Sequence, residues 1–215
     1  MKPFSQWTKE EVETEFNLRM EPDNKKLQDW LNVEQTVSAN EAEQLKKLSQ
    51  KLLYHVHDWN EEELKVYFLA FILDLIDFYQ NKYRPFMERP LSIKYDENKR
   101  LWGNVDFLVA SGTQSPKQPF FFIHEYKKQL DTSNDPLGQL LAAMVAAQKL
   151  NQSSHAIYGA YIIGRHWYFV ILDGESYSES FAYDATKEEI IMIVNILRHT
   201  KTIINQILKN ILTTN

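Results

Sequence analysis

The 215-residue sequence contains no cysteine. Disulfides and thiolate metal sites are therefore excluded, and any metal must be held by carboxylates, histidines, carbonyls or water. Long apolar runs are missing too. The amino terminus has no hydrophobic signal region, and the most apolar stretch, residues 66–79, is interrupted by Asp74 and Asp77. We therefore expect a cytoplasmic protein with no membrane partner.

An excess of basic residues is also absent. The chain has 24 lysines and arginines against 29 acidic residues, a net charge of -5, which argues against a protein that coats nucleic acid non-specifically. A nuclease is not excluded, because enzymes that bind phosphodiesters through metal ions gather acidic groups at the site. The sequence also lacks a Walker loop, a G-x-G-x-x-G turn, a G-x-S-x-G elbow and an H-E-x-x-H helix, which removes the commonest nucleotide-binding and hydrolase classes.

The composition that remains is that of a soluble globular protein, with 44% hydrophobic and 25% charged residues. The length suits one domain with an appendage. We expect a helical N-terminal extension at residues 1–59 and a second unit at residues 60–215. Within the extension, Thr8 and Glu11 form a capping-box pattern. One apolar helical stripe follows, made of Leu45, Leu48, Leu52 and Val56.

Asn60 and Glu63 repeat the capping pattern at the start of the second unit. They predict a helix from residue 61 to about residue 82. Because this helix is apolar nearly all round, we expect most of its faces to be buried.

From Pro90 onward the apolar pattern changes to every second residue, which predicts strands. Asp135 as the cap and Pro136 as the first helical residue open a helix that we expect to cross the sheet. The expected strands span residues 91–97, 101–111, 119–127, 156–164, 166–172 and 176–184, and a closing helix spans residues 187–208. This order predicts an α/β fold with a mixed central β-sheet flanked by helices.

Charged residues follow directly on the most apolar strand, residues 119–127. Residues two apart in a strand share a face, so Glu125 and Lys127 project together while His124 projects oppositely. On the preceding strand, Asp106 comes beside Glu125 if the two strands are neighbours. Two carboxylates and one lysine would then converge.

Such a trio suits metal-assisted hydrolysis of a phosphodiester. Two carboxylates hold a hard cation such as Mg²⁺ or Mn²⁺, and the lysine orients water or stabilises developing charge. The alternative is structural: Glu125 and Lys127 form a solvated ion pair at a strand end, and Asp106 caps a turn. The tripeptide Glu-x-Lys alone does not separate these interpretations.

The order of the helices and strands around Glu125-Tyr126-Lys127 gives further information about this group. A helix is followed by a hairpin strand with Gly103-Asn104-Val105-Asp106, a strand with Glu125-Tyr126-Lys127, and a helix with Gln139. This arrangement, over about residues 61–172, resembles the core of the PD-(D/E)XK nuclease superfamily, which has a restriction-endonuclease-like fold. One residue departs from the family pattern, since Val105 stands where the proline that names the motif is expected.

The resemblance implies a role for each matching residue. Asp106 and Glu125 would be metal ligands, Lys127 the catalytic lysine, and Gln139 a group that reaches the metal-bound water or the phosphate. The alternative for Gln139 is an ordinary polar residue in the first turn of a helix. An acidic residue of the first helix often completes such sites, and Glu61 is the candidate here.

Glu61 shares its helical face with Leu64, Lys65 and Phe68 and is therefore expected to point toward the sheet, whereas Glu63 caps the helix.

The expected function is that of a Mg²⁺-dependent nuclease that hydrolyses phosphodiester bonds of nucleic acid, with DNA as the expected substrate. The alternative is a catalytically inactive module of the same fold that binds protein or nucleic acid. Because many related enzymes act as dimers, a homodimer is a further expectation, although the sequence shows no self-complementary patch. The choice between DNA and RNA, the sequence specificity, and cleavage within a strand or at its end stay open.

Overall fold

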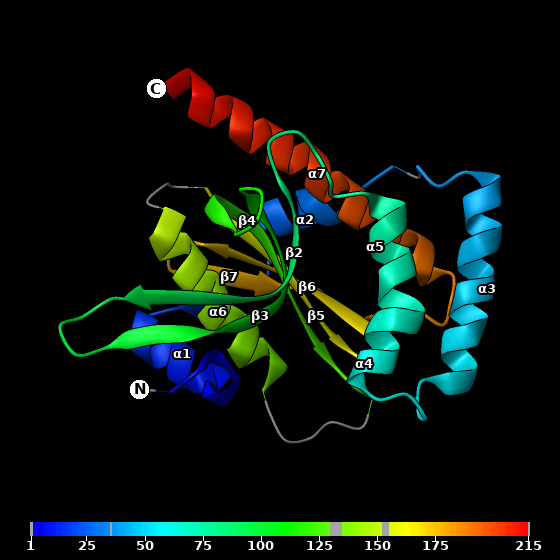
Figure 1. Ribbon diagram of the computed structural model, residues 1–215, viewed down its shortest axis with the longest axis horizontal. Helices are drawn as coiled ribbons and strands as arrows, with labels where there is room; N and C mark the ends of the chain where they lie inside the picture. The colour runs from blue at the N-terminus through cyan, green and yellow to red at the C-terminus, as the bar shows by residue number, and fades with distance from the viewer. Residues whose placement is uncertain (1, 35, 130–134, 152–154, 215) are drawn as a thin grey trace.

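The computed structural model describes residues 2–34, 36–129, 135–151 and 155–214, which form a mixed, open sheet flanked by helices (Figure 1). The strand order is β1-β7-β6-β5-β4-β3-β2, with β8 beside β6. Neighbouring strands are antiparallel except for the pairs β4 with β5 and β1 with β7, which are parallel. The predicted α/β class with a mixed central sheet is confirmed.

The strands are β1 (Arg19–Met20), β2 (Arg84–Lys94), β3 (Arg100–Ser111), β4 (Lys117–Lys127), β5 (Ile157–Ile163), β6 (His166–Asp173), β7 (Ser176–Glu179) and β8 (Tyr183–Asp184). The helices are η1 (Phe4–Gln6), α1 (Lys9–Phe16), α2 (Lys25–Leu31), α3 (Ala39–His55), α4 (Glu61–Leu64), η2 (Lys65–Leu69), α5 (Ala70–Ile76), α6 (Pro136–Asn151) and α7 (Glu189–Thr214).

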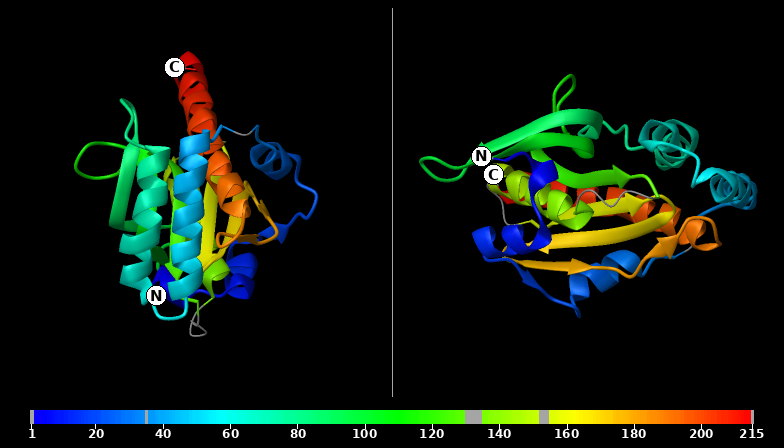
Figure 2. Two further views of the ribbon diagram at one scale, coloured as in Figure 1. Left: turned by 90° about the vertical axis from the view of Figure 1, so that its right-hand side faces the viewer. Right: turned by 90° about the horizontal axis from the view of Figure 1, so that it is seen from below.

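Each face of the sheet carries its own core. On one face, η1, α1 and α6 pack against side chains such as Leu108 and Ile123. On the other face, α2, α3, α5 and α7 pack against side chains such as Phe107 and Phe122. Helices α3 and α5 run side by side on this second face of the sheet (Figure 2). The alternation of β3 and β4 sends most neighbouring residues to opposite cores, as the period of two predicts, but Phe121 and Phe122 share one core where the register between the two strands shifts.

Turn and capping chemistry sets the boundaries of most elements. The capping boxes at Thr8 and Asn60 are both formed. Asp135 Oδ1 accepts a 2.9 Å hydrogen bond from the Gly138 amide and so caps α6. The hairpin turns contain Gly164 and Gly174 with φ of 56° and 63°, a region that favours glycine. These predicted boundaries are confirmed.

The helix expected at residues 61–82 is shorter and less buried than predicted. It passes through a π-helical turn, η2, and ends at Ile76, because Asp77 takes a left-handed conformation with φ of 54°. One side of this helix faces solvent, where Tyr67 is 44% and Phe71 is 59% exposed. The apolar pattern overestimated burial because the sheet and the neighbouring helices cover only part of the surface of this helix.

Strand β2 also begins earlier than the pattern predicts. It starts at Arg84 and contains Pro85 and Pro90. Proline has no amide to donate to a ladder, so it is tolerated in strands mainly at the edge of a sheet. Strand β2 occupies such an edge.

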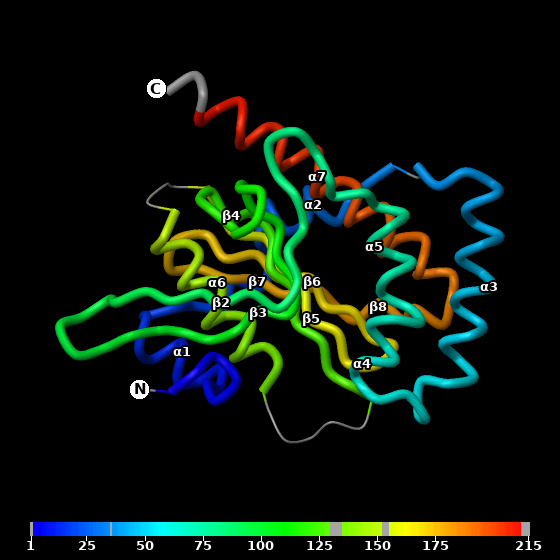
Figure 3. Tube along the Cα trace, in the orientation of Figure 1, coloured from blue at the N-terminus to red at the C-terminus, as the bar shows by residue number. Residues whose placement is uncertain are grey.

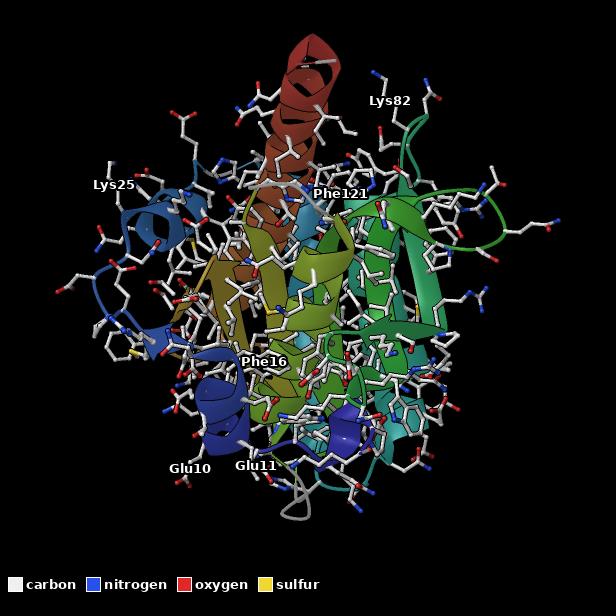
Figure 4. The ribbon with its side chains drawn as sticks, turned by 90° about the vertical axis from the view of Figure 1, so that its left-hand side faces the viewer. Glu10, Glu11, Phe16, Lys25, Lys82 and Phe121 are labelled. Atoms are coloured by element: carbon white, nitrogen blue, oxygen red, sulfur yellow. The ribbon has the colours of Figure 1, made fainter. Side chains whose placement is uncertain are left out.

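The N-terminal segment passes over the face of the sheet that carries α6, from β3 near one edge to β7 near the other (Figure 3). Pro3 bridges to Trp102 of β3, and β1 pairs in parallel with β7. Between them, the backbone of residues 7–9 lies so close to α6 that a Cβ added to Gly138 would approach it to 2.5 Å. Phe16 lies on the side of α1 toward α6, and Glu10 lies on the far side (Figure 4).

Residues of the expected extension thus contribute buried side chains to both cores, among them Phe4, Trp7, Trp30 and Leu52. The division of the chain at residue 60 stays a prediction. Within the described residues, none of the helices combines the length and the apolarity that crossing a bilayer requires.

Candidate active site

Strands β3 and β4 bring Asp106 and Glu125 together. The antiparallel register pairs Phe107 with His124, and one further step along it places Asp106 across from Glu125. Asp106 Oδ2 accepts a 2.9 Å hydrogen bond from the Tyr126 amide, which fixes that carboxylate against the end of β4. The neighbourhood predicted for these two acids is therefore present.

Helix α6 supplies the next member of the group. Gln139 Nε2 donates a 2.6 Å hydrogen bond to Glu125 Oε2. Glu125 is fully buried and Gln139 is 6% exposed, yet among the residues that the structure describes, Oε1 of each side chain has no hydrogen-bond partner. Leaving a buried acceptor unsatisfied costs free energy, so two such atoms on adjacent side chains indicate a place where a ligand or a donor binds.

Lys127 ends β4 on the same strand face as Glu125. Its side chain is 8% exposed, and its backbone carbonyl accepts a 2.8 Å hydrogen bond from the Gly164 amide, which anchors the strand end to the β5–β6 turn. Burial raises the pKa of both Asp106 and Glu125, and the positive charge of Lys127 opposes that rise. Lys127 therefore interacts electrostatically with both carboxylates.

Burial dominates the protonation of the two acids. Loss of solvent raises the pKa of Glu125 well above its ordinary value, and the neighbouring carboxylate of Asp106 raises it further. Burial also raises the pKa of Asp106, although the Tyr126 amide and the charge of Lys65 oppose the shift. A cation bound between the two carboxylates would lower the pKa of both, because a nearby positive charge favours their ionised form.

Glu61 approaches this group from α4. Its Oε1 lies 3.3 Å from the ammonium of Lys65, and its charge contributes to the raised pKa of Asp106 and of Glu125. The helix face shared by Glu61 and Lys65 does point toward the sheet, as predicted. However, the ammonium of Lys65 lies between Glu61 and Asp106, so these two carboxylates each face a cation instead of each other.

Lys65 is a member of the site that the sequence analysis missed. Its ammonium lies 2.9 Å from Glu88, 3.2 Å from Glu62 and 3.8 Å from Asp106, and its side chain is 9% exposed. Burial lowers the pKa of Lys65, but hydrogen bonding to Glu88 and the charges of Asp106 and Glu61 raise it above its ordinary value. The sequence offered one signal, a lysine on the inward face of an otherwise apolar helix.

Two irregular stretches of backbone meet at this lysine. Lys65 opens the π-helical turn η2, and its partner Glu88 has a left-handed φ of 47° within strand β2. Conformations of this kind cost free energy and are found disproportionately at functional sites. Glu88 was missed because the strand was expected to begin only after it.

His124 lies on the opposite face of β4, as expected. It is fully buried beside the rings of Tyr126 and Trp167, whose centroids lie 4.6 and 5.0 Å away. Burial lowers the pKa of His124 to about 3. It therefore belongs to the aromatic core and not to the carboxylate group.

The donor atoms of this group fit a hard divalent cation. Mg²⁺ takes oxygen ligands and commonly uses one or two carboxylates, with water and substrate phosphate completing its shell. Asp106 and Glu125 supply the carboxylates, and the unpartnered Oε1 atoms of Glu125 and Gln139 supply free oxygens. In the described part of the chain, no three histidine or acidic side chains are arranged as a complete metal-ligand set, so substrate or water would have to complete it.

No protein-family model matches this chain, and a comparison with curated proteins finds no relative.

Proposed function

We propose that this protein is a metal-dependent nuclease of the PD-(D/E)XK type that hydrolyses phosphodiester bonds of nucleic acid. One observation carries the proposal: Glu125, buried beside Asp106 and hydrogen-bonded to Gln139 at 2.6 Å, retains an oxygen that has no partner within the described part of the chain. The order of helix, three antiparallel strands, helix α6 and parallel strand β5 supports it, because it matches the element order on which the sequence resemblance rests.

Asp106 and Glu125 are the proposed ligands of Mg²⁺ or Mn²⁺. A bound divalent cation polarises a phosphate and lowers the pKa of a bound water. Gln139 fixes the orientation of Glu125 through its amide nitrogen and leaves its own oxygen free to accept a hydrogen bond from water. The Tyr126 amide does the same for Asp106, so both carboxylates are held before a ligand arrives.

Lys127 is the proposed catalytic lysine. It shares a strand face with Glu125 and interacts electrostatically with both carboxylates. In this position the ammonium stabilises the negative charge that develops on the phosphate during attack. Glu61 contributes negative charge from α4. DNA as the substrate and a second copy of the chain as a partner follow from the resemblance alone.

One observation favours a second candidate function, an inactive module of the same fold that binds protein or nucleic acid. Glu125 is fully buried and Lys127 is 8% exposed, so a substrate phosphate would have to enter a closely packed strand end. In this alternative, the polar group has a structural role and the binding surface lies elsewhere.

The experiment that separates the two begins with metal binding. Mn²⁺ is titrated calorimetrically into the parent protein, Glu125→Gln and a control, Glu188→Gln, which alters an exposed glutamate. Glutamine has the shape of glutamate and removes the cost of burying charge, so the first variant should fold. We expect binding to be lost in Glu125→Gln and retained in the control. Equal binding in all three proteins would exclude Glu125 as a ligand.

Cleavage is then assayed on single-stranded and duplex DNA and on RNA, with Mg²⁺ and Mn²⁺, in the parent and in Lys127→Ala. Metal-dependent cleavage that disappears in Lys127→Ala supports the nuclease. Absence of cleavage on every substrate, together with unchanged stability in Glu125→Gln, would support the inactive module.

A further inference from the structure

We propose that Lys65 is a built-in cation of this site, occupying the place of a second metal ion, so that the enzyme works with one divalent cation. The inference rests on the proposed function for its catalytic meaning. Its structural content is independent of that function: the ammonium of Lys65 fills a cation position among Glu61, Glu88 and Asp106.

Carboxylates from three elements surround the ammonium of Lys65. Helix α4 contributes Glu61 at 3.3 Å and Glu62 at 3.2 Å, β2 contributes Glu88 at 2.9 Å and β3 contributes Asp106 at 3.8 Å. A single ion pair would neutralise the lysine. The additional carboxylates from one helix and two strands exceed that need, and their oxygens are the donors that a divalent cation prefers.

The strand register places two of these carboxylates opposite each other. Met87 of β2 pairs with Phe107 of β3 and Arg89 pairs with Val105, so Glu88 of β2 lies opposite Asp106 of β3. Like charges directly opposite each other destabilise a sheet unless a cation lies between them. Lys65 is that cation, and Glu88 takes its left-handed conformation at the same place.

Asp106 is shared between two groups. Its Oδ1 faces Lys65, while Oδ2 accepts a hydrogen bond from the Tyr126 amide at the end of β4 beside Glu125. In two-metal sites the ions lie only about 3.5–4 Å apart, so one carboxylate between them can serve both. Here one side of Asp106 has an ammonium, and the other side has Glu125, whose Oε1 has no partner in the described part of the chain. Two cation positions are therefore present, and one is filled by the chain itself.

Lys65 is also held in place. Its side chain is 9% exposed, its ammonium lies 5.6 Å from the centre of the Tyr126 ring, and η2 begins at this residue. A lysine that merely improved solubility would extend into water. Because Lys65 is confined, a metal ion cannot take the same position without displacing it.

The test counts bound ions instead of measuring turnover. Metal-stripped parent protein, Lys65→Met, Lys65→Met combined with Glu88→Gln, and Lys99→Met are dialysed against Mn²⁺, and bound metal is measured. Lys99→Met is the matched control, because it also breaks a lysine–glutamate ion pair, with Glu15 at 2.6 Å. We expect Lys65→Met to bind one more Mn²⁺ per chain than the parent, and the double variant and the control to bind as many as the parent.

An equal number of ions in Lys65→Met and the parent would overturn the inference, as would an extra ion that persists in the double variant. If Lys65→Met does not fold without metal, its thermal unfolding is followed as Mn²⁺ is added. Refolding or stabilisation by Mn²⁺, absent in the double variant, supports the inference because a ligand of the folded state stabilises it. No response to saturating Mn²⁺ would overturn it.

The outcomes distinguish this inference from the nuclease proposal. A parent that binds no Mn²⁺ and cleaves no substrate, beside a Lys65→Met variant that binds one ion, would reject the nuclease and keep the role of Lys65 as a resident cation. A parent that loses its ion in Glu125→Gln, beside a Lys65→Met variant with no extra ion, would keep the nuclease and reject the inference.

Discussion

Glu125 and Gln139 are joined by one short hydrogen bond, 2.6 Å from the Gln139 Nε2 to the Glu125 Oε2, and Oε1 of each has no partner among the described residues. The bond connects the end of β4 to the first turn of α6. It fixes the rotamer of a fully buried carboxylate while leaving an acceptor oxygen unused. A carboxylate held in this way is ready to bind a cation, because its orientation is set before the ion arrives.

Gln139→Ala should weaken metal binding without unfolding the protein. Removing a residue that orients a metal ligand typically lowers metal affinity or activity by about 10–100-fold. We expect the Kd for Mn²⁺, measured by calorimetry, to rise by a factor in this range. Gln148→Ala on the same helix is the control and should bind as the parent does. Equal affinities for all three proteins would contradict the positioning role of Gln139.

Lys127→Ala should separate catalysis from metal binding. Loss of one stabilising group in the transition state typically lowers kcat about 100- to 1,000-fold. Mn²⁺ binding should be retained, because removing a positive charge next to two carboxylates does not disfavour a cation. Calorimetry and cleavage kinetics measure the two effects separately. Parent-like cleavage by Lys127→Ala would show that Lys127 is not the catalytic lysine.

Gly138→Ala should destabilise the protein, although alanine is the better helix former. In an exposed helix this change would stabilise by about 1 kcal/mol. Here the added Cβ would lie 2.5 Å from the backbone of Thr8 and Lys9, and such overpacking typically costs about 1–3 kcal/mol. Urea unfolding measures the net effect. A stability equal to or above that of the parent would show that the N-terminal segment moves away without cost.

Asn151→Ala should cost about 2–3 kcal/mol, since it leaves two buried backbone groups without partners. The Asn151 side chain accepts a 2.7 Å hydrogen bond from the Phe120 amide and donates a 2.8 Å hydrogen bond to the Phe120 carbonyl. A loss below about 0.5 kcal/mol in Asn151→Ala, measured by denaturant unfolding, would contradict this account.

Glu41 should make stability depend on pH under acidic conditions. Hydrogen bonding to Arg198, and then to Ser38, lowers the pKa of Glu41 from 4.5 to about 2. A lowered pKa in the folded state gives stability that is fully present above pH 4.5 and is lost as the pH falls toward 2. The carboxylate is partly exposed, so we expect about 1 kcal/mol at pH 6.

The measurement compares the free energy of unfolding of the parent and Glu41→Gln from pH 6 down to pH 2. The difference between the two proteins should shrink across this range and approach zero near its lower end. A difference that stays constant with pH would show that the ion pair with Arg198 does not contribute through its charge.

Much of the fold could be predicted because local chemistry sets it. Capping residues such as Thr8, Asn60 and Asp135 mark helix starts, and alternating apolar residues mark the strands. The approach of Asp106 to Glu125 also followed from strand alternation, since the strands that carry the two acids are neighbours, whereas the place of Gln139 beside them was implied by the family resemblance.

The parts that escaped prediction depend on long-range contacts. Strand β1 has two residues and forms through pairing with β7, which no local pattern indicates. The early start of β2 depends on its place at the sheet edge. Lys65 and Glu88 enter the site through a π-helical turn and a left-handed residue, and neither irregularity has a sequence signature of its own.

The pairing of β1 with β7 has a consequence for synthesis of the chain on the ribosome. Arg19 and Met20 find their strand partners at Ser176 and Tyr177, 157 positions later. At translation rates of roughly 5–20 residues per second, the early segment waits on the order of 8–30 seconds for its partner to be made. Until α6 at residues 136–151 has been made, the apolar side of α1 has no surface to pack against, so a nascent chain of this protein needs protection from aggregation until late in its synthesis.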